Sequence, residues 1–198
     1  MRGSMKIVLV ALAAGIVGVA AGLAVNGPGP LLRTELGQRA VQGAYALVAP
    51  PAPHGLAVAG RGDRVPDVVL PGLDGVPLRL PGDTLGRPVL VNFWASWCAP
   101  CIEEMPELDR YAQSQGDTGV HVVGIALDDA DAVRAFLQRV PVDFRIALDT
   151  PGPRDSSVQF GNPRGVLPYT VLLDAEGRVR KQRVGPFSHG EIDGWAAP

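Results

Sequence analysis

The chain has 198 residues, of which 46% are hydrophobic and 19% are charged, and its formal net charge is −2. This length allows about one ordinary domain in addition to a tail or an anchor. Because the charge is nearly balanced and the chain has no lysine- or arginine-rich run, no nucleic-acid partner is expected.

An uncharged apolar run, Ile7–Val25, follows Arg2 and Lys6 near the N-terminus. As a helix it would span roughly 28 Å, close to the hydrocarbon core of a bilayer. The apolar region of a secretory signal peptide is shorter, at about 7–15 residues. We therefore predict a transmembrane anchor at 7–25, with residues 1–6 in the cytoplasm and the rest of the chain outside. The small residues near Ala24 leave a cleaved signal segment as the alternative.

Residues 26–61 are predicted to form a linker. The sequence NGPGP at 26–30 ends the apolar run, and PPAPHG at 50–55 would break any helix. Between them, leucines and alanines at helical spacing fit a short amphipathic helix or a tether. We expect the folded domain at 62–198.

Strands and helices alternate in this domain. In chain order we expect two short strands within 65–80 around the turn Leu73-Asp74-Gly75, a buried strand at 87–95, a helix from Cys98 to about Gln115, a buried strand at 120–127, a helix over 128–140, a strand at 144–149, a hairpin over 167–184 that turns at Glu176-Gly177, and a last short helix at 188–195 capped by Ser188. This order predicts an α/β fold with a mixed central sheet and helices on both faces.

The two cysteines of the chain, Cys98 and Cys101, are three positions apart. Haem attachment requires a histidine directly after the second cysteine, where Ile102 stands. A closed zinc site requires about four ligands, and the three histidines lie far off in the sequence, so no metal is expected. A structural disulfide here would close a very small loop and constrain little entropy. A redox couple fits best, since a strand delivers Cys98 to a helix N-terminus, where backbone N–H groups favour the thiolate.

The two cysteines are expected to play different roles. Cys98 begins the helix beside Trp97 and should attack disulfides, whereas Cys101 lies one turn further, should be more buried and should resolve the mixed disulfide. Pro100 lacks a backbone N–H group. This costs no hydrogen bond, because N–H groups in the first helical turn have no partner within the helix, and the proline ring stiffens the turn.

A family resemblance extends from about Val65 to the C-terminus. The segment LVNFWASWCAPCIEEMPEL resembles the active-site segment of the thioredoxin superfamily, in particular of its membrane-anchored TlpA/ResA-like thiol-disulfide reductases. PDVVLPGLDGVPLRL resembles their N-terminal β-hairpin, and GVLPYTVLLDAEGRV resembles their segment around a cis-proline. The resemblance implies a thioredoxin fold without a cofactor, held in the inner membrane by one helix with its catalytic domain in the periplasm. It also implies oxidised protein substrates and a membrane thiol-electron donor.

The resemblance further implies roles for particular residues. Pro168 matches the cis-proline that faces the cysteine pair, which would let the backbone of Leu167 bind a substrate strand. Together with Trp97 and Pro100, these residues are the expected substrate-binding residues. Glu104 matches a glutamate that lies near the cysteines in the TlpA/ResA branch and is the third expected catalytic residue.

Two positions depart from related patterns. Ordinary thioredoxins carry a buried aspartate where this chain has Asn92, which cannot titrate. By spacing alone, Glu104 would belong to a solvated helix face with Glu103, Glu107 and Asp109. The cytochrome-maturation branch has a glutamate directly after the cis-proline, where this chain has Tyr169, which favours the broader TlpA-like group.

The predicted function is therefore extracytoplasmic reduction of protein disulfides, for cytochrome c maturation, copper-site maturation or disulfide repair. One alternative is an oxidase, although Ala99-Pro100 differs from the Pro-His dipeptide of DsbA-like oxidases. The other is a thioredoxin-fold chaperone or metal-delivery module that uses the cysteines as soft ligands for copper.

Overall fold

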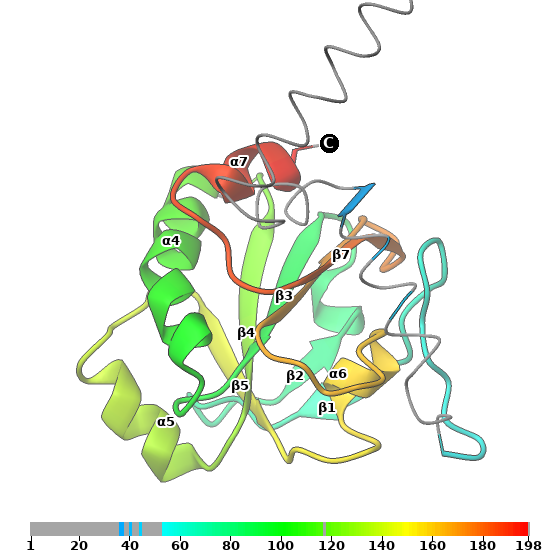
Figure 1. Ribbon diagram of the computed structural model, residues 1–198, viewed down its shortest axis with the longest axis horizontal. Coiled ribbons are helices and arrows are strands. Elements are labelled where there is room, and N and C mark those ends of the chain that lie inside the picture. The colour runs from blue at the N-terminus through cyan, green and yellow to red at the C-terminus, as the bar shows by residue number, and fades with distance from the viewer. Residues whose placement is uncertain (1–35, 38–39, 41–43, 45–52, 117, 198) are drawn as a thin grey trace, which may run out of the picture. The chain divides into compact units, whose positions relative to one another are not determined.

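The computed structural model describes residues 36–37, 40, 44, 53–116 and 118–197. The strands and helices named below all lie in one unit, Val41–Pro198, and Figure 1 shows their arrangement. The predicted anchor at 7–25 and most of the predicted linker lie outside the described residues. Within the described part of the chain, no helix has the length and apolar character needed to cross a membrane.

A five-stranded mixed sheet forms the centre of the domain, with the strand order β5-β4-β3-β6-β7. The strands are β3 (Val89–Trp94), β4 (His121–Leu127), β5 (Arg145–Asp149), β6 (Tyr169–Leu173) and β7 (Val179–Val184). Strands β3, β4 and β5 run parallel, whereas β6 is antiparallel to both β3 and β7. All residues of β3 are buried because the sheet is covered on both faces, which explains the nearly continuous apolar sequence of this strand. The predicted mixed sheet is confirmed.

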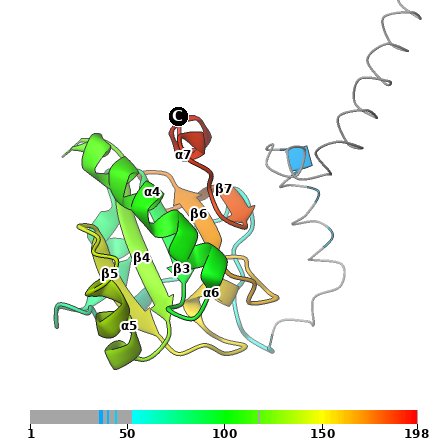
Figure 2. The same ribbon diagram turned by 60° about the vertical axis from the view of Figure 1, so that its left-hand side comes forward.

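Three helices cover one face of the sheet, namely α4 (Ala99–Gln115), α5 (Ala130–Leu137) and α7 (Glu191–Trp195) (Figure 2). Their apolar side chains pack with the sheet in one core cluster that includes Trp94, Met105, Leu108, Phe136, Ile192 and Trp195. The opposite face packs against the N-terminal hairpin and against Phe160, which ends the four-residue helix α6 (Ser156–Gln159). Helices on both faces were expected, but a β-hairpin and one short helix cover the second face.

The N-terminal hairpin pairs β1 (Val68–Leu70) with β2 (Leu78–Leu80) in an antiparallel sheet of its own. Its turn lies where the sequence predicted it: Gly75 has a positive φ of 84° and donates its N–H to the carbonyl of Gly72 at 3.0 Å. The side chain of Asp74 accepts the N–H of Val76 at 2.9 Å. A single 3-10 turn, η1 (Gly82–Thr84), follows β2.

Two helix boundaries differ from the predicted ones. Helix α5 begins after Asp129, whose side chain accepts the N–H groups of Asp131 and Ala132, and it ends at Leu137 rather than near residue 140. The predicted Ser188 cap of α7 is wrong, because Gly190 in a left-handed conformation is the N-cap. The N–H of Ser188 does bind the carboxylate of Glu191 at 2.9 Å, so half of the expected capping box forms.

Candidate active site

The cysteine pair lies where β3 leaves the sheet and α4 begins. The N–H of Cys98 donates to the carbonyl of Ala95 at 3.1 Å, which closes a turn after the strand. Cys98 is the N-cap of α4, and its carbonyl accepts the N–H groups of Cys101 and Ile102. Pro100 lies in the first helical turn, where a missing N–H leaves no hydrogen bond unmade.

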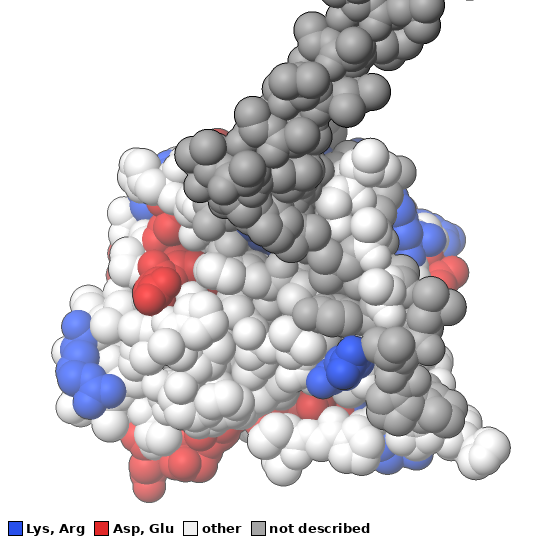
Figure 3. All heavy atoms as spheres, viewed as in Figure 1, with Lys and Arg blue, Asp and Glu red and all other residues white. Residues whose placement is uncertain are grey.

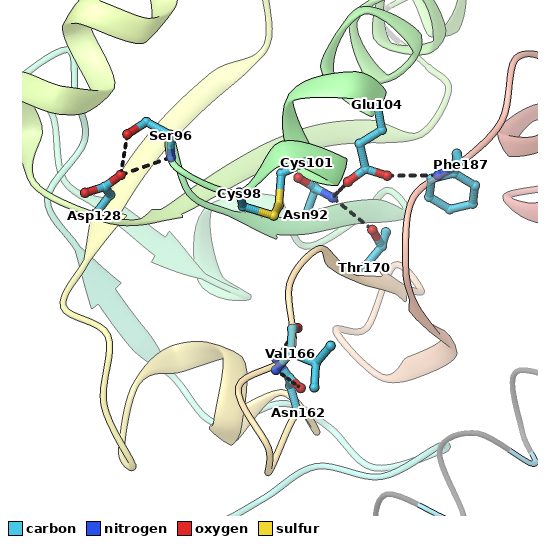
Figure 4. Close-up of a disulfide and its surroundings, with 10 residues drawn as sticks. All are labelled: Asn92, Ser96, Cys98, Cys101, Glu104, Asp128, Asn162, Val166, Thr170 and Phe187. Carbon is cyan, nitrogen blue, oxygen red and sulfur yellow. Dashed lines mark hydrogen bonds between the residues drawn. A yellow bond between two sulfur atoms is a disulfide. The ribbon is translucent and has the colours of Figure 1, made fainter.

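Cys98 and Cys101 form a disulfide, with their Cα atoms 5.3 Å apart (Figure 4). The Cys98 residue is 6% exposed and Cys101 is 0% exposed, while the neighbouring Trp97 is 68% exposed. The disulfide therefore meets the surface through Cys98, and Cys101 lies beneath it in the core.

In the reduced protein, we expect iodoacetamide near neutral pH to modify Cys98 well before Cys101. The reason is that reagent reaches only the more exposed sulfur and that the N-terminus of α4 favours its thiolate. Brief labelling followed by peptide mapping measures the order of modification. Faster labelling of Cys101 would reverse the assigned roles of nucleophile and resolving thiol.

The bond between Leu167 and Pro168 is cis, as the resemblance implied. The segment before it is held by Asn162, whose side chain accepts the N–H of Val166 at 3.1 Å and donates to its carbonyl at 3.0 Å. The carbonyl of Pro168 accepts the N–H of Gly185 at 2.9 Å. This segment is therefore fixed from two sides, by the end of α6 and by the end of β7.

A surface hollow of about 280 Å³ brings Trp97 and Leu167 together. Its other walls come from the end of β4 and from the segment around α6, through Leu127, Pro151, Gly152, Pro153, Asp155, Val158, Pro163, Arg164 and Gly165. The sequence prediction named Trp97 and Leu167 but missed the other residues, because nothing in the sequence shows that the segment at 151–165 lies beside the cysteine segment.

Glu104 is fully buried, one helical turn beyond Cys101. One carboxylate oxygen accepts the side-chain N–H of Asn92 at 2.8 Å, and the other accepts the backbone N–H of Phe187 at 3.0 Å. Burial raises the pKa of Glu104 to about 7, although both hydrogen bonds and the charge of Arg183 act in the opposite direction. Glu104 is thus a buried titratable group and does not belong to a solvated face.

Glu107 is also buried, contrary to the solvated-face interpretation, at 7% exposure. It binds the guanidinium of Arg110 and accepts the backbone N–H of Gly190 at 2.7 Å. These contacts lower the pKa of Glu107, with the hydrogen bond from Arg110 as the largest cause. Glu103 remains exposed, so the expected solvated face is correct for Glu103 but wrong for Glu104 and Glu107.

Arg183, in β7, is a further residue that the sequence prediction missed. It is 1% exposed, and its guanidinium binds the carboxylate of Glu191 at 2.9 Å and the carbonyl of Pro186 at 2.8 Å. It also lies 4.4 Å from the ring centre of Phe187. Arg183 therefore holds the segment between β7 and α7 in the position from which Phe187 donates to Glu104.

Glu104→Gln should remove a step near pH 7 from the pH profile of thiol-disulfide exchange. A carboxyl group that titrates near pH 7, one turn from the resolving cysteine, changes charge in the range where exchange is measured. Stopped-flow rates between pH 5 and 9 test this, with Glu103→Gln as the control, since Glu103 is exposed on the same helix. Profiles of the same shape in wild type and Glu104→Gln would exclude Glu104 from the exchange step.

The same substitution should change the pH dependence of stability. The pKa of Glu104 is higher in the folded protein than the usual 4.5, so the folded state binds a proton that the unfolded chain releases. Its contribution to the free energy of unfolding is therefore present below pH 4.5 and is lost as the pH rises to about 7. Urea unfolding at pH 5 and pH 8 should show a smaller loss of stability for Glu104→Gln than for wild type.

Within the described residues, no three His, Cys, Asp or Glu side chains come together in a metal-binding group. Met105, the nearest additional soft ligand considered from sequence, is fully buried in the core cluster around α4.

Known proteins share this fold and this segment. The family model described as Redoxin matches residues 61–195. The thiol-disulfide oxidoreductase ResA of Geobacillus thermodenitrificans (strain NG80-2) is 33% identical over 132 residues, which cover 66% of this chain and 73% of the relative. ResA of Bacillus subtilis (strain 168) is 31% identical over 132 residues, covering 66% of this chain and 71% of the relative.

A solved structure shows the same architecture. The crystal structure of a putative thiol:disulfide interchange protein DsbE from Chlorobium tepidum aligns with a TM-score of 0.58 at 31% identity, covering 69% of this chain and 94% of that one. This similarity confirms the predicted thioredoxin fold. The chain therefore belongs to the redoxin family, and it is a thiol-disulfide oxidoreductase of the ResA-like group.

Proposed function

We propose that this protein is an extracytoplasmic, membrane-anchored reductase of protein disulfides that acts through Trp97-Cys98-Ala99-Pro100-Cys101. The observation that carries this proposal is the asymmetry of the cysteine pair: Cys98 is 6% exposed and follows Trp97, which lines the hollow, whereas Cys101 is fully buried. A nucleophile at the surface and a resolving thiol beneath it are what reduction of a large substrate requires.

The reaction begins with the dithiol form of the protein. The Cys98 thiolate attacks one sulfur of a substrate disulfide, and the other substrate sulfur leaves as a thiolate and takes up a proton. The Cys101 thiol then loses its proton and attacks the Cys98 sulfur, which releases the second substrate thiol and forms the Cys98–Cys101 disulfide. A dithiol donor in the membrane restores the reduced protein, becoming a disulfide itself. In this scheme Glu104 takes up and returns the proton of Cys101.

The surface beside the cysteines suits a protein substrate. The exposed Trp97 and the half-buried Leu167 line the 280 Å³ hollow, and Trp97 directly precedes Cys98 in the chain. The face of the domain in Figure 3 carries acidic and basic side chains in small separate groups. Recognition through backbone hydrogen bonds at Leu167 and apolar contacts in the hollow would accept many substrate segments.

The proposed location rests on the residues before the domain. Arg2 and Lys6 precede the uncharged run Ile7–Val25, which is long enough to cross a membrane as a helix. An oxidising compartment outside the cytoplasm is also where a reductase of protein disulfides has substrates. Retention in the membrane fraction at high salt and alkaline pH supports an anchor, whereas a soluble mature form that starts near residue 25 shows a cleaved signal segment.

The direction of the reaction is tested by two assays on the same purified protein. With a limiting dithiol donor, the reduced protein should cleave the disulfides of insulin. The oxidised protein should introduce disulfides into a reduced, unfolded protein much more slowly. Faster oxidation than reduction would identify an oxidase, and stoichiometric copper binding without insulin reduction would favour the metal-delivery alternative.

A further inference from the structure

Asn92 holds a buried acceptor without a partner. It lies in the middle of β3 between two neighbouring strands, opposite Gly124 and Thr170, and is 0% exposed. Its side-chain oxygen, Oδ1, makes no hydrogen bond, and it is the one buried side-chain acceptor in that state among the described residues. Because buried polar atoms are almost always paired, this exception requires an explanation.

The orientation of the Asn92 amide is fixed by its nitrogen. Nδ2 donates to Oε1 of Glu104 at 2.8 Å and to the hydroxyl of Thr170 at 3.0 Å. When Glu104 is ionised, its carboxylate can only accept hydrogen bonds, so the nitrogen then faces Glu104 and the oxygen points away from it. In Figure 4 this oxygen lies on the side of the Cys98–Cys101 disulfide, and Glu104 and Thr170 lie on the other side.

The disulfide explains why the acceptor is unpaired in this redox state. Two bonded sulfurs carry no hydrogen and cannot donate. When a dithiol donor supplies two electrons and two protons, the S–S bond breaks, each cysteine gains an S–H group, and the donor becomes a disulfide. Cys101 is fully buried, so water does not reach its new S–H group.

We propose that Asn92 accepts a hydrogen bond from the Cys101 thiol when the disulfide is reduced. This hydrogen bond gives both Oδ1 of Asn92 and the buried S–H group of Cys101 a partner. It stabilises the dithiol form over the disulfide, and it keeps the proton on Cys101 while Cys98 acts as the nucleophile. Asn92 then connects the resolving thiol to Glu104 through one amide group. The proposal requires only that the pair is reduced during the catalytic cycle, so it does not depend on the direction of the net reaction.

The infrared S–H stretching band of Cys101 tests the proposal without any substrate. Cys98→Ser leaves Cys101 as the single thiol of the chain, so its band is observed alone. In the folded variant the band should lie at a lower frequency than in the same protein unfolded in urea, as expected for a hydrogen-bonded thiol. A band at the position of a free thiol in the folded Cys98→Ser protein would overturn the proposal, and this measurement needs no change at Asn92.

A pair of double variants then identifies the acceptor. Adding Asn92→Leu to Cys98→Ser should move the band to the free-thiol position, whereas adding Thr170→Val should leave it shifted. Thr170→Val removes a partner of Nδ2 but leaves Asn92 bonded to Glu104. A band that keeps its lower frequency in the Asn92→Leu double variant, or that moves to the free-thiol position in both double variants, would show that Asn92 is not the specific acceptor.

The redox equilibrium gives an independent readout. With both cysteines present, Asn92→Leu should lower the equilibrium constant for reduction by a dithiol about three- to tenfold, as for the loss of one hydrogen bond from the reduced form. Thr170→Val serves as the control. An unchanged equilibrium constant in Asn92→Leu would contradict the proposal, even if insulin reduction by the wild type established the proposed function.

Discussion

Cys98→Ser is expected to lower the rate of insulin reduction by roughly a thousandfold or more, to the background rate of the dithiol donor alone. Cys98 is the cysteine that meets the surface, and it is the N-cap of α4, where backbone N–H groups favour a thiolate. A serine hydroxyl at this position is not ionised and cannot replace the thiolate in disulfide exchange. Initial rates at a fixed concentration of dithiothreitol measure the effect.

The matched control for this substitution is Glu103→Gln, which lies on the exposed side of the same helix and should retain the wild-type rate. Circular dichroism separates loss of chemistry from loss of fold. If Cys98→Ser retained most of the wild-type rate, the nucleophile would have to be Cys101, despite its complete burial.

Arg183→Met is expected to lower the free energy of unfolding by about 2–4 kcal/mol. Methionine matches part of the length and the apolar stem of arginine but removes the guanidinium from Oε1 of Glu191 and from the carbonyls of Gly185 and Pro186. The cost should lie toward the lower end of values for broken buried ion pairs, because the Glu191 side chain is 21% exposed and water can reach it. Urea unfolding followed by tryptophan fluorescence measures this difference.

Arg180→Met provides the comparison, since Arg180 is an exposed residue of the same strand and its replacement should change stability by less than about 0.5 kcal/mol. Similar midpoints for Arg183→Met and Arg180→Met would mean that the segment between β7 and α7 does not depend on the buried guanidinium. Arg183→Lys should fall between wild type and Arg183→Met, because a lysine keeps the charge but cannot bind the carboxylate and the carbonyls through one planar group.

The sheet and the cysteine segment could be predicted because their signals are local. The apolar strand β3, the helix that follows it and the two cysteines occupy one continuous stretch, 89–115. The turns at Gly75 and Gly177 carry their own residue signal, and both glycines have a positive φ. The C-terminal hairpin and the succession of strands and helices along the chain follow from such local patterns.

The buried glutamates could not be predicted because their partners are distant in the sequence. Glu104 binds the N–H of Phe187 and Glu107 binds the N–H of Gly190, each across a separation of 83 residues. On the helix alone, four acidic residues close together fit a solvated face. Only the packing of the segment 185–190 against α4 gives two of them buried backbone donors.

Arg183 had only a weak signal in the sequence, its place in a predicted strand. Counting from the buried Val179 with the two-residue period of a strand would put both side chains on one face, but the register of β7 is irregular, so Val179 lies opposite Leu173 whereas Arg183 lies opposite Thr170 on the other face. Helix α6 had a weaker signal in the sequence. Its four residues are too few to show a helical period, and its N-cap, Asp155, lies in a segment rich in turn residues. The hollow beside Trp97 depends on this segment and was missed with it.

The central claim, that Cys98 attacks substrate disulfides and Cys101 releases the product, is tested most directly by trapping. Cys101→Ser should still attack oxidised substrates but cannot resolve the mixed disulfide. Expressed with its N-terminal segment in its own host, this variant should accumulate covalent adducts that disappear with dithiothreitol, while Cys98→Ser should accumulate almost none. The trapped proteins identify the pathway: apocytochrome c for haem maturation, a copper-site protein for oxidase assembly, or many secreted proteins for disulfide repair. Adducts that form in Cys98→Ser but not in Cys101→Ser would contradict the account.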